Sequence, residues 1–397
     1  MVLTNAMGIL PASFRVRMSI FAAVLAGLLC VPAVASACDL PPGPDDELSV
    51  ETLETFSGSL DGSFRGKFIQ IPFNVLEGIK GLRIRYCYDN DGPDNQTGTS
   101  GGVNHNLDNT TLDLGVYQSN NEDPENWTMA QRRGWSGSAI KIVGIGENGH
   151  TDKDTYLADR DAYVPGHTTR AYKPGPTPAG MWAVELGAGY IDDEPGYQTE
   201  YQVEVATMSD PGWTNEHFEP NPYEPYVANP AAGWYTGDLH AHGENEPGNA
   251  PMEDTFDLGF GAAGSGGIGL DFMTLVDHNN DTARQTELGK YAAEYPGKLI
   301  VPGTEMTTYD GHFNSQNSSE FTDFRLGEIL RFDDSNADNY LQNGELTHVR
   351  DPEDPSSRFS QIQAAGGWTQ INHPTTFKTD PAGCRGCAWT YLSLIHI

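Results

Sequence analysis

The chain has 397 residues and a formal net charge of −32, with 45 glycines and 26 prolines along it. This length allows two domains and a leader, and the turn-rich composition favours β-sandwiches and α/β barrels over helical bundles. So acidic a surface repels nucleic acid and anionic lipid, and we therefore exclude both as partners.

The first 37 residues have the pattern of an export signal. Arg15 and Arg17 precede an apolar run over residues 18–34, and the small residues 35–37 provide a cleavage site. We expect a secreted or periplasmic protein with no membrane insertion after residues 1–37 are removed. A lipid anchor at Cys38 is the less favoured alternative, because Ala35 replaces the leucine usually found three residues before a lipidated cysteine.

Export implies an oxidising compartment, in which cysteines form disulfides. Pairing of Cys38 with Cys87, and of Cys384 with Cys387, is plausible, but four cysteines allow three connectivities. The Cys-x-x-Cys pair lacks the second half of a zinc ribbon, so a local disulfide or two free thiols are favoured over a zinc site.

Residues 38–208 are expected to form an antiparallel β-sandwich. Apolar and polar residues alternate over residues 82–88, 112–116, 182–186 and 201–205, and Gly, Asn, Asp and Pro fill the gaps. The proline-rich residues 209–230 are the expected linker.

Three acids in the first domain could bind calcium: Asp89, Asp91 and Asp94. Their spacing does not match an EF-hand, so a solvated loop is favoured over a calcium site.

Residues 231–397 are expected to form a second domain, in which strands and helices alternate. Strands are predicted within residues 234–242, 270–278, 298–306 and 368–373, and helices within 252–263, 281–295 and 355–365. This alternation predicts parallel strands in an open sheet or a barrel. A long segment between His312 and His373, with Asp333, Asp334 and Asp338, is expected to be a solvated loop or lid.

Metal-binding residue types fall at the ends of the predicted strands: His240, His242, Asp277, His278, Glu305 and His373, with His312 shortly after the third strand. In a parallel barrel the carboxyl ends of strands converge on one face, where active sites lie. The sequence therefore predicts one metal centre built from residues far apart in the chain.

The spacing of these residues suits more than one ion. His240 and His242, two apart on a strand, point to the same side and can bind one ion. Glu305 has two oxygens and can bridge that ion to a second, which His312 and His373 would complete. Water held between two such ions becomes a nucleophile near neutral pH, which indicates hydrolysis.

Four motifs in this order, "GDLHAH", "LDFMTLVDHN", "PGTEMTTYDGHFN" and "INHP", resemble the PHP superfamily. The sequence is most similar to its CehA/McbA-type metallohydrolases, and "CRGCAWTY", "RRGWSGSA" and "PTPAGMWAVELG" add to the likeness, which covers most of residues 80–390. The resemblance implies a distorted seven-stranded β/α barrel holding two or three divalent ions, commonly Zn, Mn or Fe.

The resemblance also implies which residues bind each ion. His240, His242 and Glu305 would bind the first ion, and Glu305, His312 and His373 the second. His278 would bind a third ion together with an acid from the loop after His242, for which Glu246 is the candidate and Glu244 the rival.

Other residues are expected to support the chemistry. Glu305, His312 and Asp277 are expected at the catalytic centre, with Asp277 and Asp238 orienting imidazoles, and Asn314 is expected to contact substrate. The Asp-x-His motif that ends the family's pattern does not follow His373, so we expect a C-terminally truncated domain that binds metal incompletely.

These observations favour an exported metal-dependent hydrolase that acts on a small-molecule phosphoester, carboxylic ester or carbamate. The alternative is an extracellular protein that binds a glycan or other ligand and carries a degenerate metal domain.

Overall fold

The computed structural model describes residues 38–42, 50–89, 98–100, 103–105, 110–120, 123, 126–160, 163–193, 195–209, 218–246, 250–341, 345–374 and 389. The expected leader, Asp91, Asp94, Cys384 and Cys387 lie outside these residues. Among the helices of the described part, none has the length and apolar character needed to cross a membrane.

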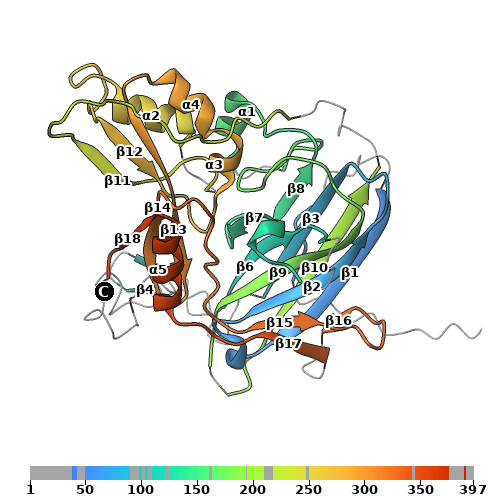
Figure 1. Cartoon of the computed structure of the whole chain (residues 1–397). Helices are drawn as coiled ribbons and strands as arrows, with labels where there is room; N and C mark the ends of the chain where they lie inside the picture. Colours follow the sequence, from blue (N-terminus) through green and yellow to red (C-terminus); the bar gives the residue numbers. More distant parts are fainter. Residues whose placement is uncertain are drawn as a thin grey trace, which may run out of the picture. The chain divides into compact units, whose positions relative to one another are not determined.

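Two large sheets make up the first half of the fold (Figure 1). One has the order β16-β1-β10-β3-β8, and the other has the order β17-β15-β2-β9-β6-β7. The strands contributed by the first half are β1 (Val50–Leu60), β2 (Phe68–Val75), β3 (Gly81–Tyr88), β6 (Thr110–Tyr117), β7 (Arg132–Gly137), β8 (Ile142–Gly146), β9 (Gly180–Ile191) and β10 (Thr199–Met208). Smaller elements accompany them: η1 (Gly62–Phe64), β4 (Gly98–Ser100), β5 (Val103–His105), η2 (Met129–Gln131) and α1 (Lys153–Ala158).

Side chains along these strands alternate between two faces. Apolar side chains are buried on one face, and polar side chains pair with one another on the other. Trp182, Tyr86 and Ile84 lie in the common core of the two sheets. On the other face of β3 and β10, Arg83 and Arg85 both bind Glu204, at 3.1 and 2.6 Å. The four predicted strand segments are confirmed as β3, β6, β9 and β10, and Cys38 is bonded to Cys87 as predicted.

The segment between His312 and His373 extends both sheets, which differs from the free loop or lid that the sequence predicts. β15 (Ile329–Phe332) pairs in parallel with β2, β16 (Tyr340–Leu341) pairs with β1, and β17 (Leu346–Arg350) pairs with β15. Leu330, Phe332 and Leu341 join the sandwich core, whereas Asp333 and Asp338 lie exposed in the turn between β15 and β16. Such short apolar runs carry no clear period, so sequence pattern alone does not identify them as strands.

The second half contains a separate five-stranded sheet, ordered β11-β12-β13-β14-β18. β11 (Gly237–Ala241), β12 (Phe272–Leu275) and β13 (Leu299–Thr308) are parallel, which confirms the prediction for this part. β14 (Gly311–Gln316) then turns back on β13 as a hairpin, and β18 (Trp368–Ile371) pairs antiparallel with β14. The described strands therefore form a mixed sheet in a β-rich fold.

Helices lie between these strands, close to where the sequence predicts them. They are α2 (Met252–Phe260), α3 (Thr282–Thr286), α4 (Leu288–Glu294) and α5 (Pro355–Ala364). The single helix predicted over residues 281–295 is instead two, with a break at Glu287. The Glu287 carboxylate lies 3.2 Å from the Nδ1 atom of His150 in the sandwich. The break therefore coincides with a contact between residues that are far apart in the sequence.

Candidate metal centre

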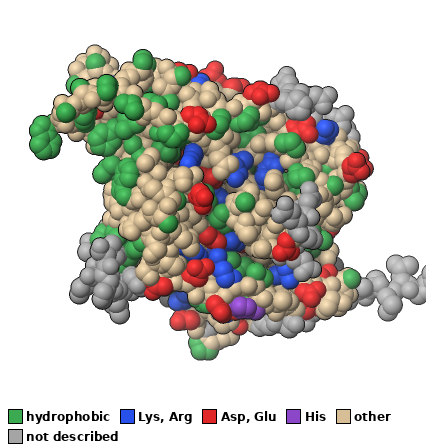
Figure 2. All heavy atoms as spheres, in the orientation of Figure 1, with side chains coloured by type: hydrophobic (Ala, Val, Ile, Leu, Met, Phe, Trp, Pro, Cys, Tyr) green, Lys and Arg blue, Asp and Glu red, His purple; other side chains and the backbone are tan. Residues whose placement is uncertain are grey.

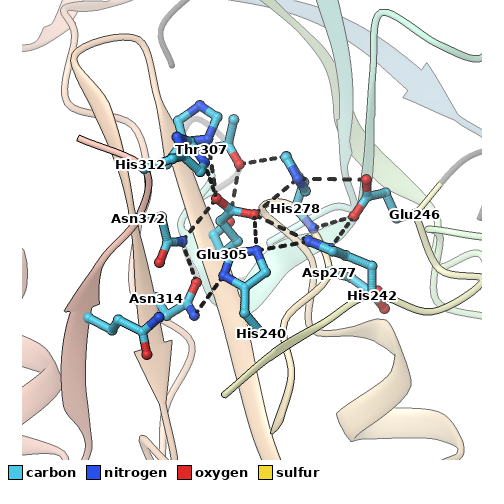
Figure 3. Close-up of polar contacts among 12 residues, drawn as sticks. His240, His242, Glu246, Asp277, His278, Glu305, Thr307, His312, Asn314 and Asn372 are labelled. Atoms are coloured by element: carbon cyan, nitrogen blue, oxygen red, sulfur yellow. Dashed lines mark hydrogen bonds and ion pairs between the residues drawn. The ribbon is translucent and has the colours of Figure 1, made fainter. Parts of the chain in front are cut away.

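β11 carries the first two imidazoles of the site. His240 and His242 are two residues apart at the end of this strand, and their Nε2 atoms lie 3.0 Å from each other (Figure 3). Both also face Oε2 of Glu305, at 3.1 Å from His240 and 3.5 Å from His242. Three donor atoms from two strands therefore form a small triangle.

β12 ends just before His278, and an isolated bridge joins His278 to Glu305 on β13. Nε2 of His278 lies 3.0 Å from Oε2 of Glu305 and 3.6 Å from Oε1 of Glu246. The other oxygen of Glu246 lies 2.6 Å from Nδ1 of His242. Glu246 is therefore the acid that the structure brings to the cluster. Its rival Glu244 is buried and pairs with Arg170 at 2.5 Å.

The second oxygen of Glu305 faces the remaining two histidines. His312 Nδ1 and His373 Nε2 each lie 3.2 Å from Oε1, and the Asn372 amide donates to the same oxygen at 2.9 Å. His373 has a φ of 26°, a backbone region that non-glycine residues seldom occupy. All five histidines of the predicted cluster thus lie around one carboxylate.

Glu305 is almost completely buried, yet it stays ionised. Burial raises the pKa of its carboxyl, but hydrogen bonds from His240, His278 and His312 bring that pKa far below its usual range. Burial also lowers the pKa of His312, although Glu305 opposes this shift. The nearby carboxylates Glu246 and Glu305 instead raise the pKa of His242 and His278 against the effect of burial, so a metal ion would compete with protons there, because ligand imidazoles are neutral.

The donor geometry fits divalent cations. Two ligands at ~2.0–2.1 Å from one ion, at a tetrahedral angle, lie ~3.3 Å apart, close to the 3.0–3.5 Å separations among His240, His242 and Glu305. Within the described residues, Nε2 of His312 and Nδ1 of His373 are buried and have no hydrogen-bond partner. Three groups of residues could each hold an ion: His240, His242 and Glu305; His242, Glu246 and His278; and His278, Glu305 and His312.

Surrounding side chains orient these imidazoles. Asn314 is fully buried, and its amide nitrogen donates to the Leu239 carbonyl and lies 3.2 Å from Nδ1 of His240. Its oxygen accepts from Asn372 at 2.6 Å. Asn314 thus positions His240, and its expected contact with substrate stays a prediction.

The two aspartates expected to orient imidazoles bind backbone amides instead. Asp277 Oδ1 accepts from the Gly243 amide at 2.6 Å, and burial raises the pKa of Asp277 to about 7. Asp238 lies exposed and accepts from the amide of His240 at 2.9 Å. Both therefore shape the backbone next to the ligands on β11, and a catalytic role for Asp277 stays a prediction.

Thr307 and Asn372 are site residues that motif spacing alone does not identify. The Thr307 hydroxyl lies 2.8 Å from Nδ1 of His278, which leaves Nε2 facing Glu305. A signal for each exists in the sequence: Thr307 is two residues after Glu305 on a strand and so shares its face, and Asn372 directly precedes His373.

No family model, curated protein or solved structure matches the chain.

Proposed function

We propose that this protein is an exported metal-dependent hydrolase of the PHP type. The observation that supports the proposal most is the arrangement of five imidazoles and Glu246 around the buried Glu305. Glu246 and Glu305 leave Nε2 of His312 and Nδ1 of His373 without a hydrogen-bond partner among the described residues, whereas two or three divalent ions such as Zn, Mn or Fe would give the imidazoles further partners.

The residues of the chain would hold and orient these ions. Oε2 of Glu305 lies near His240, His242 and His278, and Oε1 lies near His312 and His373. The carboxylate would therefore help to hold an ion on each side. Bound ions would supply a water activated near neutral pH and would polarise a phosphoryl or carbonyl oxygen. Asn314 and Thr307 engage the Nδ1 atoms of two imidazoles, and this directs each Nε2 inward.

The site is also open enough to admit a substrate. Glu305 and His312 form a buried floor, whereas the side chains of His240, His278 and His373 keep 28%, 35% and 31% of their surface exposed. We infer that β11, β12, β13, β14 and β18 belong to a distorted β/α barrel with the metal centre at its mouth. Phosphoesters, carboxylic esters and carbamates all react through an activated water and a stabilised oxyanion, so they form the substrate class.

A Glu305→Ala variant, compared with Glu320→Ala, tests the proposal. Glu320 is exposed and serves as the matched control. Metal content would be measured by elemental analysis, and hydrolysis with aryl phosphate, aryl acetate and aryl carbamate. We expect Glu305→Ala to lose bound metal and at least roughly 100-fold in hydrolysis, with Glu320→Ala unchanged.

Two outcomes would contradict the proposal. Equal metal content in wild type and Glu305→Ala would show that the ligands are assigned wrongly. Bound metal without hydrolysis of any of the three substrates would favour the alternative, an extracellular binding protein.

A further inference from the structure

A cavity of about 370 Å³ lies between the sandwich and α3. Arg132 and Arg133 of β7, Lys173 and Gln118 line it from the sandwich, and Gln285 lines it from α3. Figure 2 shows basic side chains gathered near α3 and β7 on this face. A cluster of cations is unexpected in a chain with a formal net charge of −32. Cations that no carboxylate pairs with would indicate a binding site for an anion.

Arg133 is buried, and no carboxylate in the described part of the chain pairs with it. Its guanidinium donates to the carbonyls of Lys173, Gly175 and Pro176 at 2.6–3.0 Å, and to the side-chain oxygen of Gln118 at 3.1 Å. All four acceptors are neutral, so the positive charge of Arg133 is solvated by dipoles and not compensated.

Lys173 adds a second positive charge, which Asp281 offsets electrostatically without forming an ion pair. No hydrogen bond or ion pair joins its ammonium group to any residue in the described ranges. The pKa of Lys173 is lowered to about 8, mainly by burial; Asp281 opposes this shift, and Arg132 and Arg133 contribute to it. A bound anion would relieve both the repulsion and the missing hydrogen bonds.

Arg132 supplies the third cation and is only partly balanced. It donates to Asp281 at 3.0 Å and to the Asn279 carbonyl at 2.6 Å, and its Nε atom is buried with no partner among the described residues. Counting only the residues that the structure describes, three cations thus face one carboxylate, which makes the cavity positive.

We propose that this cavity binds a small organic anion whose phosphate or carboxylate group lies against the ammonium group of Lys173, in the positive field of the buried Arg132 and Arg133. The volume lies within the usual range of small-molecule sites. Prolines at 174, 176 and 178 form one wall of the cavity. Their fixed φ angles keep this wall stiff, so it would lose little conformational entropy when a ligand binds. The site is separate from the metal centre and does not depend on the proposed hydrolase activity.

Calorimetric titration with sulfate, inorganic phosphate and succinate, at constant ionic strength, tests the proposal. The variants are Lys173→Met, which removes the unpaired ammonium, and Gln118→Glu, which adds a carboxylate beside Arg133 and keeps every cation. Lys290→Met removes an exposed lysine on α4 and controls for net charge. Glu305→Ala disrupts the metal centre, so anion binding that remains in this variant can be assigned to the cavity.

We expect saturable binding of at least one probe that persists in Glu305→Ala and Lys290→Met. Lys173→Met and Gln118→Glu should each weaken it about 10-fold or more, the usual effect of losing a charge-assisted hydrogen bond. Tighter binding of phosphate and sulfate than of succinate would identify a phosphate-type ligand, and the reverse order a carboxylate. The proposal is overturned if no probe saturates, if Lys173→Met and Gln118→Glu bind like wild type, or if Glu305→Ala alone abolishes binding.

Discussion

Glu244 and Glu246 are two residues apart in the loop after β11, and their surroundings differ. The Glu246 carboxylate lies beside His242 and His278 at 2.6 and 3.6 Å, whereas Glu244 accepts from Arg170 at 2.5 Å. At the scale of single residues, one acid is therefore placed for metal binding and the other for holding the sandwich to the loop.

Replacing each acid with glutamine should separate these two roles. We expect Glu246→Gln to lower the number of bound ions with little change in folding stability. Glu244→Gln should keep the metal but lose about 1–3 kcal/mol of unfolding free energy, because the half-buried Arg170 loses one of its two carboxylate partners. Elemental analysis and urea denaturation would measure both quantities, and metal loss in Glu244→Gln alone would reverse the assignment.

Asp113 gives a pH prediction away from the metal ligands. Its carboxylate accepts from the Tyr309 hydroxyl at 2.7 Å, and burial raises the pKa of Asp113 to about 6, although Tyr309 and Lys141 oppose the shift. The folded state therefore holds a proton that the unfolded state releases near pH 4. Its contribution to stability is present below that pH and is lost as the pH rises towards 6.

Asp113→Asn removes this titration and keeps an acceptor for Tyr309. We expect the unfolding free energy of the variant to rise relative to that of wild type as the pH goes from 4 to 7. The rise should be about 2 kcal/mol once the partial exposure of the side chain is allowed for. Urea denaturation of both proteins at each pH would measure the difference. A difference that stays constant with pH would show that the pKa of Asp113 is the same in the folded and unfolded states.

At the scale of elements, the loop from β12 to α3 is held by Asn280. Its buried amide nitrogen reaches the carbonyls of Ala171 at 2.8 Å, Asn245 at 3.2 Å and Trp135 at 3.3 Å, while its oxygen accepts from the Thr282 amide at 2.8 Å. This loop also carries His278, so the sandwich helps to position a metal ligand.

Asn280→Ala should therefore affect both stability and metal binding. We expect a loss of about 2–4 kcal/mol in unfolding free energy, because several buried groups lose their partners, and weaker metal binding at fixed free metal. Asn336→Ala, in an exposed turn, is the matched control and should cost under about 1 kcal/mol. Unchanged metal affinity in a folded Asn280→Ala protein would show that the loop holds His278 without this anchor.

Elements with a local signal could be predicted from the sequence. Alternation identifies β3, β6, β9 and β10, and the His240–His242 spacing places two imidazoles on one side of a strand, as the structure shows. Both signals depend on residues within one strand, where the two-residue period determines the side on which each side chain lies.

Features that depend on distant contacts could not be predicted in this way. The break between α3 and α4 accompanies the contact of Glu287 with His150, and β15 and β16 acquire their strand partners from β2 and β1. The choice between Glu244 and Glu246 likewise depends on Arg170, more than 70 residues earlier in the chain. No local pattern carries this information, because the partners meet only in the folded chain.

On the scale of the whole molecule, residues 36–397 form one compact unit by their contacts. The chain leaves the sandwich after β10 and forms β11 to β14 of the five-stranded sheet. It then returns to the sandwich through β15, β16 and β17, and β18 completes the five-stranded sheet. Because the second half supplies strands to the sandwich, we expect the two halves to unfold together, although separate domains commonly unfold in separate steps.

Cavity-creating variants in the two halves would test this cooperativity. Leu341 of β16 is buried in the sandwich core, and Phe256 of α2 is buried in the core beside β12. Leu341→Ala should cost about 2–5 kcal/mol and Phe256→Ala about 3–5 kcal/mol. Each should shift one common transition, whether it is followed by tryptophan fluorescence or by release of metal. Val349→Ala, at a more exposed position on β17, is the control and should shift the transition little. Two transitions that respond separately, one to each variant, would show that the returning strands do not couple the sandwich to the metal centre.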